Sequence, residues 1–328
     1  MARKKKEHVV LRQEDMLRIP DAETYRELPE EQFRICPEDD EAEAIVRPST
    51  TYWHDVWQRF RRDPMALCGL VFIVLMTLAA ILIPRFSPYS YDGFFFKSRN
   101  LGPSWEHLCG TDQMGRDIFI RILYGARISL TVGVVAAAIN FVIGVIYGGI
   151  SGYAGGRTDM IMMRIVDILT SLPSLLYIVL IMLVLGSNVG SVILALCFTS
   201  WIGTARVVRS EVMRLKHSEY VLAARLSGAT PWYLLVHHLV PNAMGPIIVS
   251  TAFLIPSAIF SEAFLSFLGI GIQAPQASWG TLANEAIPVM MTYPHQLFFP
   301  VAFICLTMFS FNFIGDGLRD ALDPRMKH

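Results

Sequence analysis

The sequence has few charged residues and no excess of either sign. Only 17% of its 328 residues are Asp, Glu, Lys or Arg, and 28 basic residues balance 28 acidic ones. Soluble globular proteins average about 25% charged residues, so this low share points away from that class. A net charge of zero gives no electrostatic basis for binding nucleic acid, and we expect no nucleic-acid partner.

Several kinds of chemical site are missing as well. The sequence has five widely spaced cysteines: Cys36, Cys68, Cys109, Cys197 and Cys305. None forms a C-x-x-C pair, which argues against a zinc motif and favours small buried hydrophobes. The eight histidines form no ligand set, and no nucleophile–base arrangement is visible. We therefore expect no catalytic residue, no metal site and no cofactor in this chain.

A phosphate-binding loop is also absent. Nucleotide-binding motors carry G-x-x-x-x-G-K-[ST], whose Lys and hydroxyl contact the phosphates and magnesium. The glycine-rich segment 153–160, YAGGRTDM, has no lysine and does not have the spacing of this motif. The chain is therefore not expected to bind ATP as a motor subunit does.

Long apolar runs are what the sequence has in abundance. A helix that crosses a bilayer needs about 20 mostly apolar residues. Six segments meet this requirement: 66–84, 128–150, 161–185, 189–205, 243–268 and 296–314. The third and fourth are separated only by the residues GSN, which predicts a tight hairpin. The sequence thus predicts an all-α, polytopic integral membrane protein with six transmembrane helices in a permease domain spanning 65–328.

The distribution of Lys and Arg predicts the orientation. If six spans alternate, 22 of the 28 basic residues fall on one side, and the other six lie between Arg85 and Arg127. Cytoplasmic loops carry the excess of Lys and Arg, so both termini are expected in the cytoplasm. Arg116, Arg121 and Arg127 are expected on an interfacial helix that runs into the second span.

The N-terminal region precedes the first span. It begins with MARKKKEHVVLRQEDM, a basic cluster with no apolar core behind it, which is unlike a signal peptide. Residues 1–50 are polar and are expected to form a cytoplasmic tail. Residues 51–64 place Trp53, Val56, Trp57 and Phe60 on one helical face beside several arginines, which predicts an amphipathic helix in the membrane interface.

The connection between the fourth and fifth spans, residues 206–242, carries a pattern of its own. Its part SEYVLAARLSGATPWYLLVHHLVPN predicts two short helices joined by a turn. Gly228 suits the end of the first helix, and Thr230 followed by Pro231 suits the start of the second. Pro241 is expected to end the second helix. A short, rigid helix held off the membrane can insert into a groove on a cytoplasmic partner, although an ordinary amphipathic connector has the same composition.

This stretch resembles the EAA loop of bacterial ABC-importer permeases, whose pattern is E-A-A-x-x-x-G, nine residues, then I-x-L-P. Here the pattern reads Leu222-Ala223-Ala224, Gly228 and then His238-Leu239-Val240-Pro241 at the same spacing. Leu222 replaces the acidic residue, and Glu219, one turn earlier, can supply a polar contact in its place. Segments 107–130, 262–280 and 312–325 are similar to signatures of the C-type permease subunit of oligopeptide and dipeptide importers.

The resemblance covers about residues 50–328 and implies a type I ABC importer fold. It implies a channel built with a homologous second permease subunit and driven by two cytoplasmic ABC ATPase subunits, which hold ATP and magnesium. A peptide-binding protein outside the membrane would deliver the cargo, and the EAA loop would fit into a cleft of the ATPase. The residues expected to couple this chain to the ATPase are Glu219, Ala223, Ala224, Gly228, Thr230, Pro231, Trp232 and Pro241. The implied location is the bacterial inner membrane, with the lipid bilayer as surroundings.

A second group of polar residues lies inside the apolar segments. Ionisable residues there are functional candidates by default. Arg164 and Asp167 are spaced as a local ion pair, or as a gate or loop anchor. Glu262 is expected to line the pathway, to tie down the external loop or to serve as a satisfied side chain between packed helices. Ser250, Ser257 and Ser261 form one polar stripe, which suits either a wet cavity or helix–helix contact. Gly144-x-x-x-Gly148 favours close helix packing.

Three rival interpretations remain open at this stage. The same machinery can import another cargo, such as nickel or a sugar. An ion-driven secondary transporter would work without an ATPase and would need a better buried ionisable site. A membrane scaffold or sensor would use the segment only to hold a partner.

Overall fold

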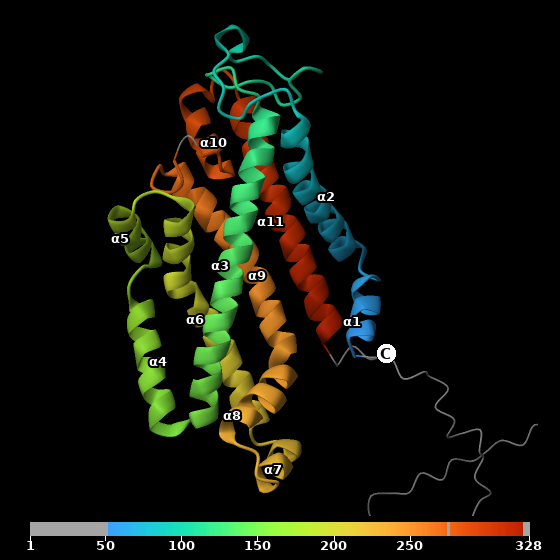
Figure 1. Ribbon diagram of the computed structural model, residues 1–328, viewed down its shortest axis with the longest axis vertical. Coiled ribbons are helices and arrows are strands. Elements are labelled where there is room, and N and C mark those ends of the chain that lie inside the picture. The colour runs from blue at the N-terminus through green and yellow to red at the C-terminus, as the bar shows by residue number, and fades with distance from the viewer. Residues whose placement is uncertain (1–51, 274–275, 324–328) are drawn as a thin grey trace, which may run out of the picture. The chain divides into compact units, whose positions relative to one another are not determined.

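The computed structural model describes residues 52–273 and 276–323, so the expected N-terminal tail, 1–50, lies outside the described residues. Helices account for nearly all the regular structure in this part of the chain (Figure 1). Only an isolated bridge between Thr111 and Asp117 has strand geometry there. The all-α prediction is confirmed.

Eleven α-helices are described between Tyr52 and Asp323. Their bounds are α1 Tyr52–Phe60, α2 Pro64–Phe86, α3 Ile118–Ala154, α4 Gly156–Ser171, α5 Ser174–Leu185, α6 Val189–Leu215, α7 Glu219–Leu226, α8 Pro231–Tyr233, α9 Val240–Phe267, α10 Trp279–Ala286 and α11 His295–Leu322. A π-helical turn, η5 (Leu234–Leu239), joins α8 to α9. Two 3-10 turns, η4 (Phe96–Ser98) and η6 (Ile287–Val289), lie in the connections.

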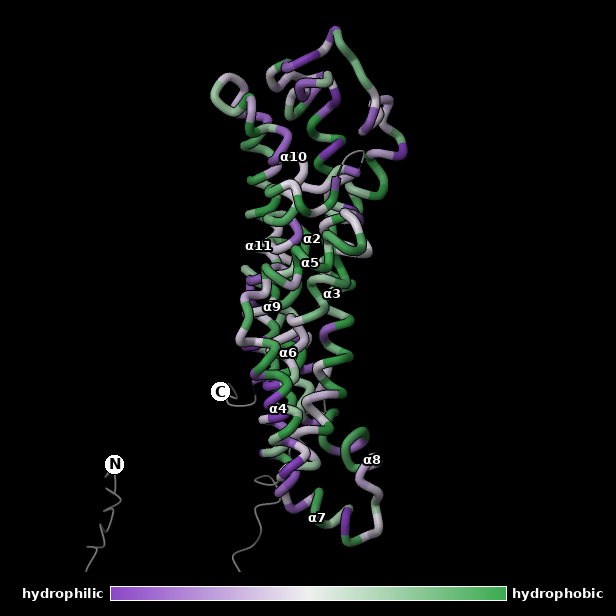
Figure 2. Tube along the Cα trace, turned by 90° about the vertical axis from the view of Figure 1, so that its left-hand side faces the viewer, coloured by the Kyte–Doolittle hydropathy of each residue, from purple (hydrophilic) through white to green (hydrophobic). Residues whose placement is uncertain are grey.

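Five of the described helical segments are long and apolar enough to cross a membrane, and a sixth is obtained if α4 and α5 are counted as one broken span. Figure 2 shows hydrophobic residues predominating along the middle of these helices and hydrophilic residues gathering towards the ends. The helices are longer than the apolar runs in several places. For example, α6 continues to Leu215 and α11 continues to Leu322. The helices thus include residues 206–215 and 315–322, which were expected to lie outside the membrane core.

The expected third span, 161–185, is not one straight helix. The chain bends by 80° between α4 and α5. Leu172 has extended backbone geometry (φ −98°, ψ 142°) and precedes Pro173. Proline lacks an N–H and disfavours helical geometry at the preceding residue, so the apolar composition that suggested a continuous span is interrupted here.

Close contact between α3 and α6 forms the centre of the bundle. A Cβ added at Gly144 would lie 2.6 Å from Cβ of Thr204, and one at Gly148 would lie 2.3 Å from the carbonyl oxygen of Ala205. These distances leave no room for a side chain, which confirms the close packing predicted from Gly144-x-x-x-Gly148. Gly152 extends the same contact towards Arg209.

The N-terminal end of the described chain packs against α11. Val56 and Phe60 of α1 are buried with Ala321 and Leu322, whereas Trp53 and Trp57 are about half exposed. The four residues expected to share one membrane-facing side are therefore divided between the protein interior and the surroundings. After α1 the chain turns and starts α2 at Pro64, and Asp63 caps α2 by accepting from the backbone N–H groups of Met65 and Ala66.

Candidate functional site

The coupling segment, defined here as residues 218–241, stands at one end of the helix bundle. Helix α7 lies beyond the ends of α3 and α4, and α8 is beside those ends (Figure 1). Glu219, Ala223, Gly228 and Thr230 are exposed there, and so are Pro231, Trp232 and Pro241. Ala224 is half-buried. The structure thus gathers the sequence-predicted coupling residues on one projecting element, with most of their surface free.

An apolar core anchors this element to the bundle. Val221 of α7 and Leu234 and Leu239 of η5 have no exposed surface, and they pack with Val208 of α6 and Ile247 of α9. Full burial of one such aliphatic side chain contributes roughly 1.5–3 kcal/mol. The segment is therefore packed as an extension of α6 and α9.

The turn between α7 and α8 has the chemistry expected of it. Gly228 has φ +86°, a left-handed conformation that costs other residues about 1–2 kcal/mol. The Thr230 hydroxyl accepts from the backbone N–H of Tyr233 at 3.3 Å, and Pro231 occupies the first helical position. The predicted stop and start of the two helices are found at these residues.

The predicted role of Pro241 is wrong. It lies in the first turn of α9, and the helical path runs on from Pro231 to Phe267. The widened η5 turn precedes it, in which the N–H of Val240 donates to the carbonyl oxygen of Leu235. The Asn242 side chain also donates to the carbonyl oxygen of His238 at 2.5 Å. The widened π-turn thus accommodates proline without ending the helix.

The coupling segment also exposes apolar side chains that the motif did not single out. Leu222 is 55% exposed, Leu226 82% and Trp232 63%. Leu222 and Leu226 are one turn apart on α7 and form one face with Ala223. Clustered apolar surface of this kind marks an interaction site. The i, i+4 spacing of the two leucines was the available signal in the sequence, but the alanine–glycine pattern of the motif does not include Leu226.

The predicted pathway residues are not gathered in one place. Ser250 is half-buried and lines a cavity of about 510 Å³ between α6, α9 and α11, together with Arg319. Ser257 and Ser261 lie further along α9. Each of the three hydroxyls donates to a carbonyl oxygen of its own helix, at 2.8–3.0 Å. The stripe is therefore internally satisfied and presents acceptor lone pairs to its surroundings.

Asp167 has a different partner from the one that its spacing suggests. Its Oδ1 lies 3.4 Å from Nη2 of Arg206 on α6. Arg164 makes no ion pair or side-chain hydrogen bond with the residues that the structure describes. The predicted ion pair between Arg164 and Asp167 is therefore wrong. Because α6 packs beside α4, Arg206 comes close to Asp167, and this neighbour cannot be inferred from spacing within α4.

Glu262 is enclosed by the protein. It has no exposed surface; its Oε2 accepts from the Ser129 hydroxyl of α3 at 2.7 Å, and its Oε1 accepts from Ser266 at 2.9 Å. Ser266 in turn accepts from the N–H of Ile272, just after α9. Of the three roles expected for Glu262, this placement favours helix packing against α3 and tying down the segment after α9 over lining a pathway.

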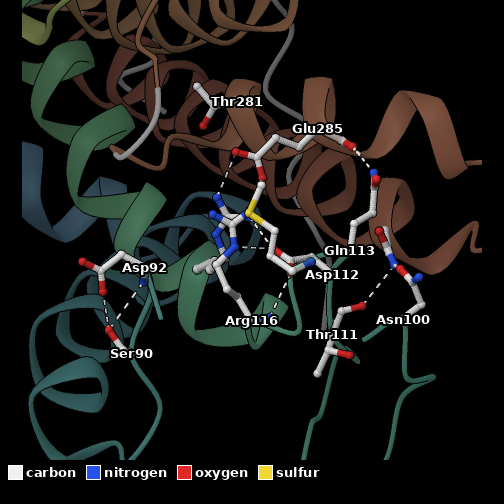
Figure 3. Close-up of polar contacts among 12 residues, drawn as sticks. Ser90, Asp92, Asn100, Thr111, Asp112, Gln113, Arg116, Thr281 and Glu285 are labelled. Atoms are coloured by element: carbon white, nitrogen blue, oxygen red, sulfur yellow. Dashed lines mark hydrogen bonds and ion pairs between the residues drawn. The ribbon is translucent and has the colours of Figure 1, made fainter. Parts of the chain in front are cut away.

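A charged cluster at the opposite end of the bundle was missed in the sequence. Arg116 contacts Asp112 at 2.6 Å and Glu285 at 2.7 Å (Figure 3). Arg121, only 2% exposed, contacts the same two carboxylates at 2.7 and 2.6 Å. The two arginines join the segment between α2 and α3 to α10, which is why Arg121 is buried rather than interfacial. Asp112 and Arg116 are four residues apart, which was a local signal for part of the cluster. Glu285 lies 164 or more positions from both arginines, and local spacing carries no signal for its part.

Arg127 lies further along α3. It donates to the carbonyl oxygens of Ala80 and Ile81 in the C-terminal part of α2, at 2.6 and 3.1 Å, and its guanidinium lies 4.7 Å from the ring centre of Tyr124. Arg121 and Arg127 lie on a helix that runs into the second span, as expected, but Arg116 precedes it because α3 begins at Ile118. Arg127 connects α3 to α2.

Cys109, in the segment between α2 and α3, should resist alkylation. Burial, and to a smaller extent the charge of nearby Asp117, raises the pKa of its thiol to about 12. The reactive thiolate is therefore scarce at pH 8. Mass spectrometry after maleimide treatment should find Cys109 unmodified while a cysteine placed by Glu106→Cys, at an exposed site in the same segment, reacts readily. Equal labelling of the two would contradict this expectation.

Comparison with known proteins identifies the family to which the sequence is related. Residues 140–328 match a family described as "Binding-protein-dependent transport system inner membrane component", and residues 51–103 match "N-terminal TM domain of oligopeptide transport permease C". The "Oligopeptide transport system permease protein OppC" of Bacillus subtilis is 52% identical over 88% of this chain and 94% of the relative. The "Dipeptide transport system permease protein DppC" of the same organism is 48% identical over 93% of this chain and 96% of the relative.

A solved structure shares the fold. A chain of the inward-facing MetNI methionine ABC transporter aligns with a TM-score of 0.50 at 17% identity, covering 63% of this chain and 96% of that one. This likeness confirms the type I importer fold and carries nothing about cargo. With its apolar helices, the chain is a multi-pass protein of the bacterial inner membrane. The chain belongs to the family of binding-protein-dependent transport system inner membrane components.

Proposed function

We propose that this chain is a permease subunit of an ATP-driven peptide importer and forms half of its channel with a homologous second permease. Two cytoplasmic ATPases bind ATP and magnesium, and an extracytoplasmic binding protein delivers the peptide. The chain itself supplies no catalytic group and no cofactor. Its relatives are named as oligopeptide and dipeptide permeases, which supports the cargo class.

The observation that carries this proposal is the rigid, projecting coupling segment. Its outer face is apolar and exposed, and its inner face is packed against α6 and α9. An ATPase that closes on ATP moves α7, and the buried contacts pass that movement to helices that cross the membrane. Both termini and the coupling segment lie in the cytoplasm in this proposal, in agreement with the bias of Lys and Arg. Glu219, Ala223, Thr230 and Trp232 contact the ATPase.

Reconstitution tests the proposal directly. Vesicles that contain this chain, its partner permease, both ATPases and the binding protein should take up radiolabelled trialanine only when ATP is present on the ATPase side. Omission of the ATPases is the control. Uptake driven by an ion gradient without the ATPases would contradict the proposal, and so would ATP-dependent uptake of nickel or a sugar with no peptide uptake.

A further inference from the structure

Two ion pairs connect α4 to α6, and they differ in strength. The Arg209 guanidinium donates two hydrogen bonds of 2.5 Å to the Asp159 carboxylate, and Asp159 also accepts from the Ser151 hydroxyl at 2.6 Å. Arg206 reaches Asp167 with a single contact of 3.4 Å, and both of its side chains are half exposed, at 50% and 56%. Bidentate, enclosed pairs hold structure, whereas single, exposed pairs contribute little and exchange partners easily. The second pair is therefore available to another ligand.

The exposed pair lies within the two helices rather than at their ends. Asp167 is 11 residues from the start of α4, and Arg206 is nine residues from the end of α6. At a rise of about 1.5 Å per residue, both lie roughly 15 Å along their helices. Because the last turns of α6 continue past its expected apolar run, the pair lies towards the end of the spans that carries the coupling segment. Charged side chains exposed within a span face water or protein rather than lipid.

The backbone beside this pair leads to the same conclusion. The break between α4 and α5 at Leu172 and Pro173 follows Asp167 by little more than one turn, and Ser171 next to it is exposed. Irregular backbone at membrane depth is tolerated only where protein buries it or where it lines a water-filled cavity. Two independent features of α4, the pair and the break, thus indicate a wet surface.

A polar stripe on α6 continues that surface. Gly203, Arg206 and Ser210 are exposed and follow one another at spacings of three and four residues, on one face of the helix. Val207, next to Arg206, lines the cavity of about 510 Å³ that also contains Ser250. Arg206 and Asp167 do not line that cavity themselves, and their pair lies on a face of α6 that exposes small and polar residues.

We propose that Asp167 and Arg206 form a transient binding site for the two charged ends of a peptide inside the channel. The Asp167 carboxylate accepts from the terminal ammonium, and the Arg206 guanidinium donates to the terminal carboxylate. Arg164, one turn from Asp167 and without a partner among the described residues, adds a second cation for the carboxylate. The ends of an extended tripeptide are about 10 Å apart, so the 3.4 Å contact between the two side chains must open for both ends to bind. Each side chain then exchanges its contact within the pair for one with the peptide, so neither charge is left unpaired. This inference rests on the proposed function.

The test compares cargo with and without a charged end. The reconstituted complex is supplied with saturating binding protein and either trialanine or trialanine with its carboxylate amidated. Arg206→Gln should lower trialanine uptake about tenfold, the expected cost of losing one charge-assisted hydrogen bond, and should change uptake of the amide by less than about twofold. Asp167→Asn should discriminate in the same way against N-acetylated trialanine. Binding of radiolabelled trialanine to the complex without the binding protein should weaken to the same extent.

Arg209→Gln is the matched control, since it removes the structural pair between the same two helices. It should lower uptake of all cargoes in parallel. If Arg206→Gln also lowers trialanine and its amide by the same factor, or changes neither uptake nor binding, the pair is structural and the inference is wrong. If the wild-type complex shows no ATP-dependent uptake of trialanine, the proposed function itself fails, and the inference falls with it.

Discussion

Leu226→Glu should abolish capture of the ATPases by the permease while leaving the chain folded. Leu226 is 82% exposed at the end of α7 and takes no part in the apolar core that anchors the coupling segment. A glutamate there costs folding only a few tenths of a kcal/mol, as an unfavourable charge near a helix C-terminus. In a complex, the same charge would be buried without a partner in an apolar contact. Loss of a central apolar anchor, together with that desolvation, is expected to weaken binding about hundredfold.

The measurement is co-purification of the ATPases with a tagged permease, followed by ATP-dependent uptake of trialanine. Met291→Glu serves as the matched control: Met291 is 88% exposed, in the turn before α11, and receives the same change of charge. It should retain both ATPases. Retention of the ATPases by Leu226→Glu would show that α7 is not the docking element, and their loss from both variants would point to general destabilisation.

Local patterns in the sequence were sufficient for much of the fold. Helix spans follow from apolar runs, because lipid requires every backbone hydrogen bond to be satisfied within a helix. The turn of the coupling segment follows from Gly228 and Thr230, since their conformation and capping are decided within a few residues. The contact at Gly144 and Gly148 was also readable, because small residues one turn apart leave a groove whatever the partner helix is.

What could not be predicted depends on which helices become neighbours. Asp167 pairs with Arg206, and Arg121 with Glu285, and both pairs join residues that are far apart in the chain. Spacing suggested Arg164 for the first and a membrane-interface position for Arg121. The π-turn before Pro241 was missed for a different reason: proline disfavours a regular helix, but the widened turn before it allows the helix to continue.

Gly148→Val should separate α3 from α6 and destabilise the whole bundle. A Cβ at this position would lie 2.3 Å from the carbonyl oxygen of Ala205 and 2.9 Å from Cβ of Val208, and the branched side chain adds two further methyl groups. The nearest obstacle is backbone, so no side-chain rotation relieves it and the helices must move apart. Overpacking of a close contact typically costs 1–3 kcal/mol, and here we expect about 3 kcal/mol.

Gly203→Val on the neighbouring helix is the control that isolates packing from helix propensity. A Cβ at Gly203 meets nothing within 4 Å, so the same substitution there changes only the backbone preference, by a few tenths of a kcal/mol. Thermal unfolding of the purified chain in detergent should show a markedly lower midpoint for Gly148→Val and little change for Gly203→Val. Because α6 leads into α7, purified Gly148→Val should also transmit less of the ATPase movement. We expect it to take up fewer peptides for each ATP hydrolysed. Equal midpoints for the two variants would mean that α3 and α6 do not touch as closely as the glycines indicate.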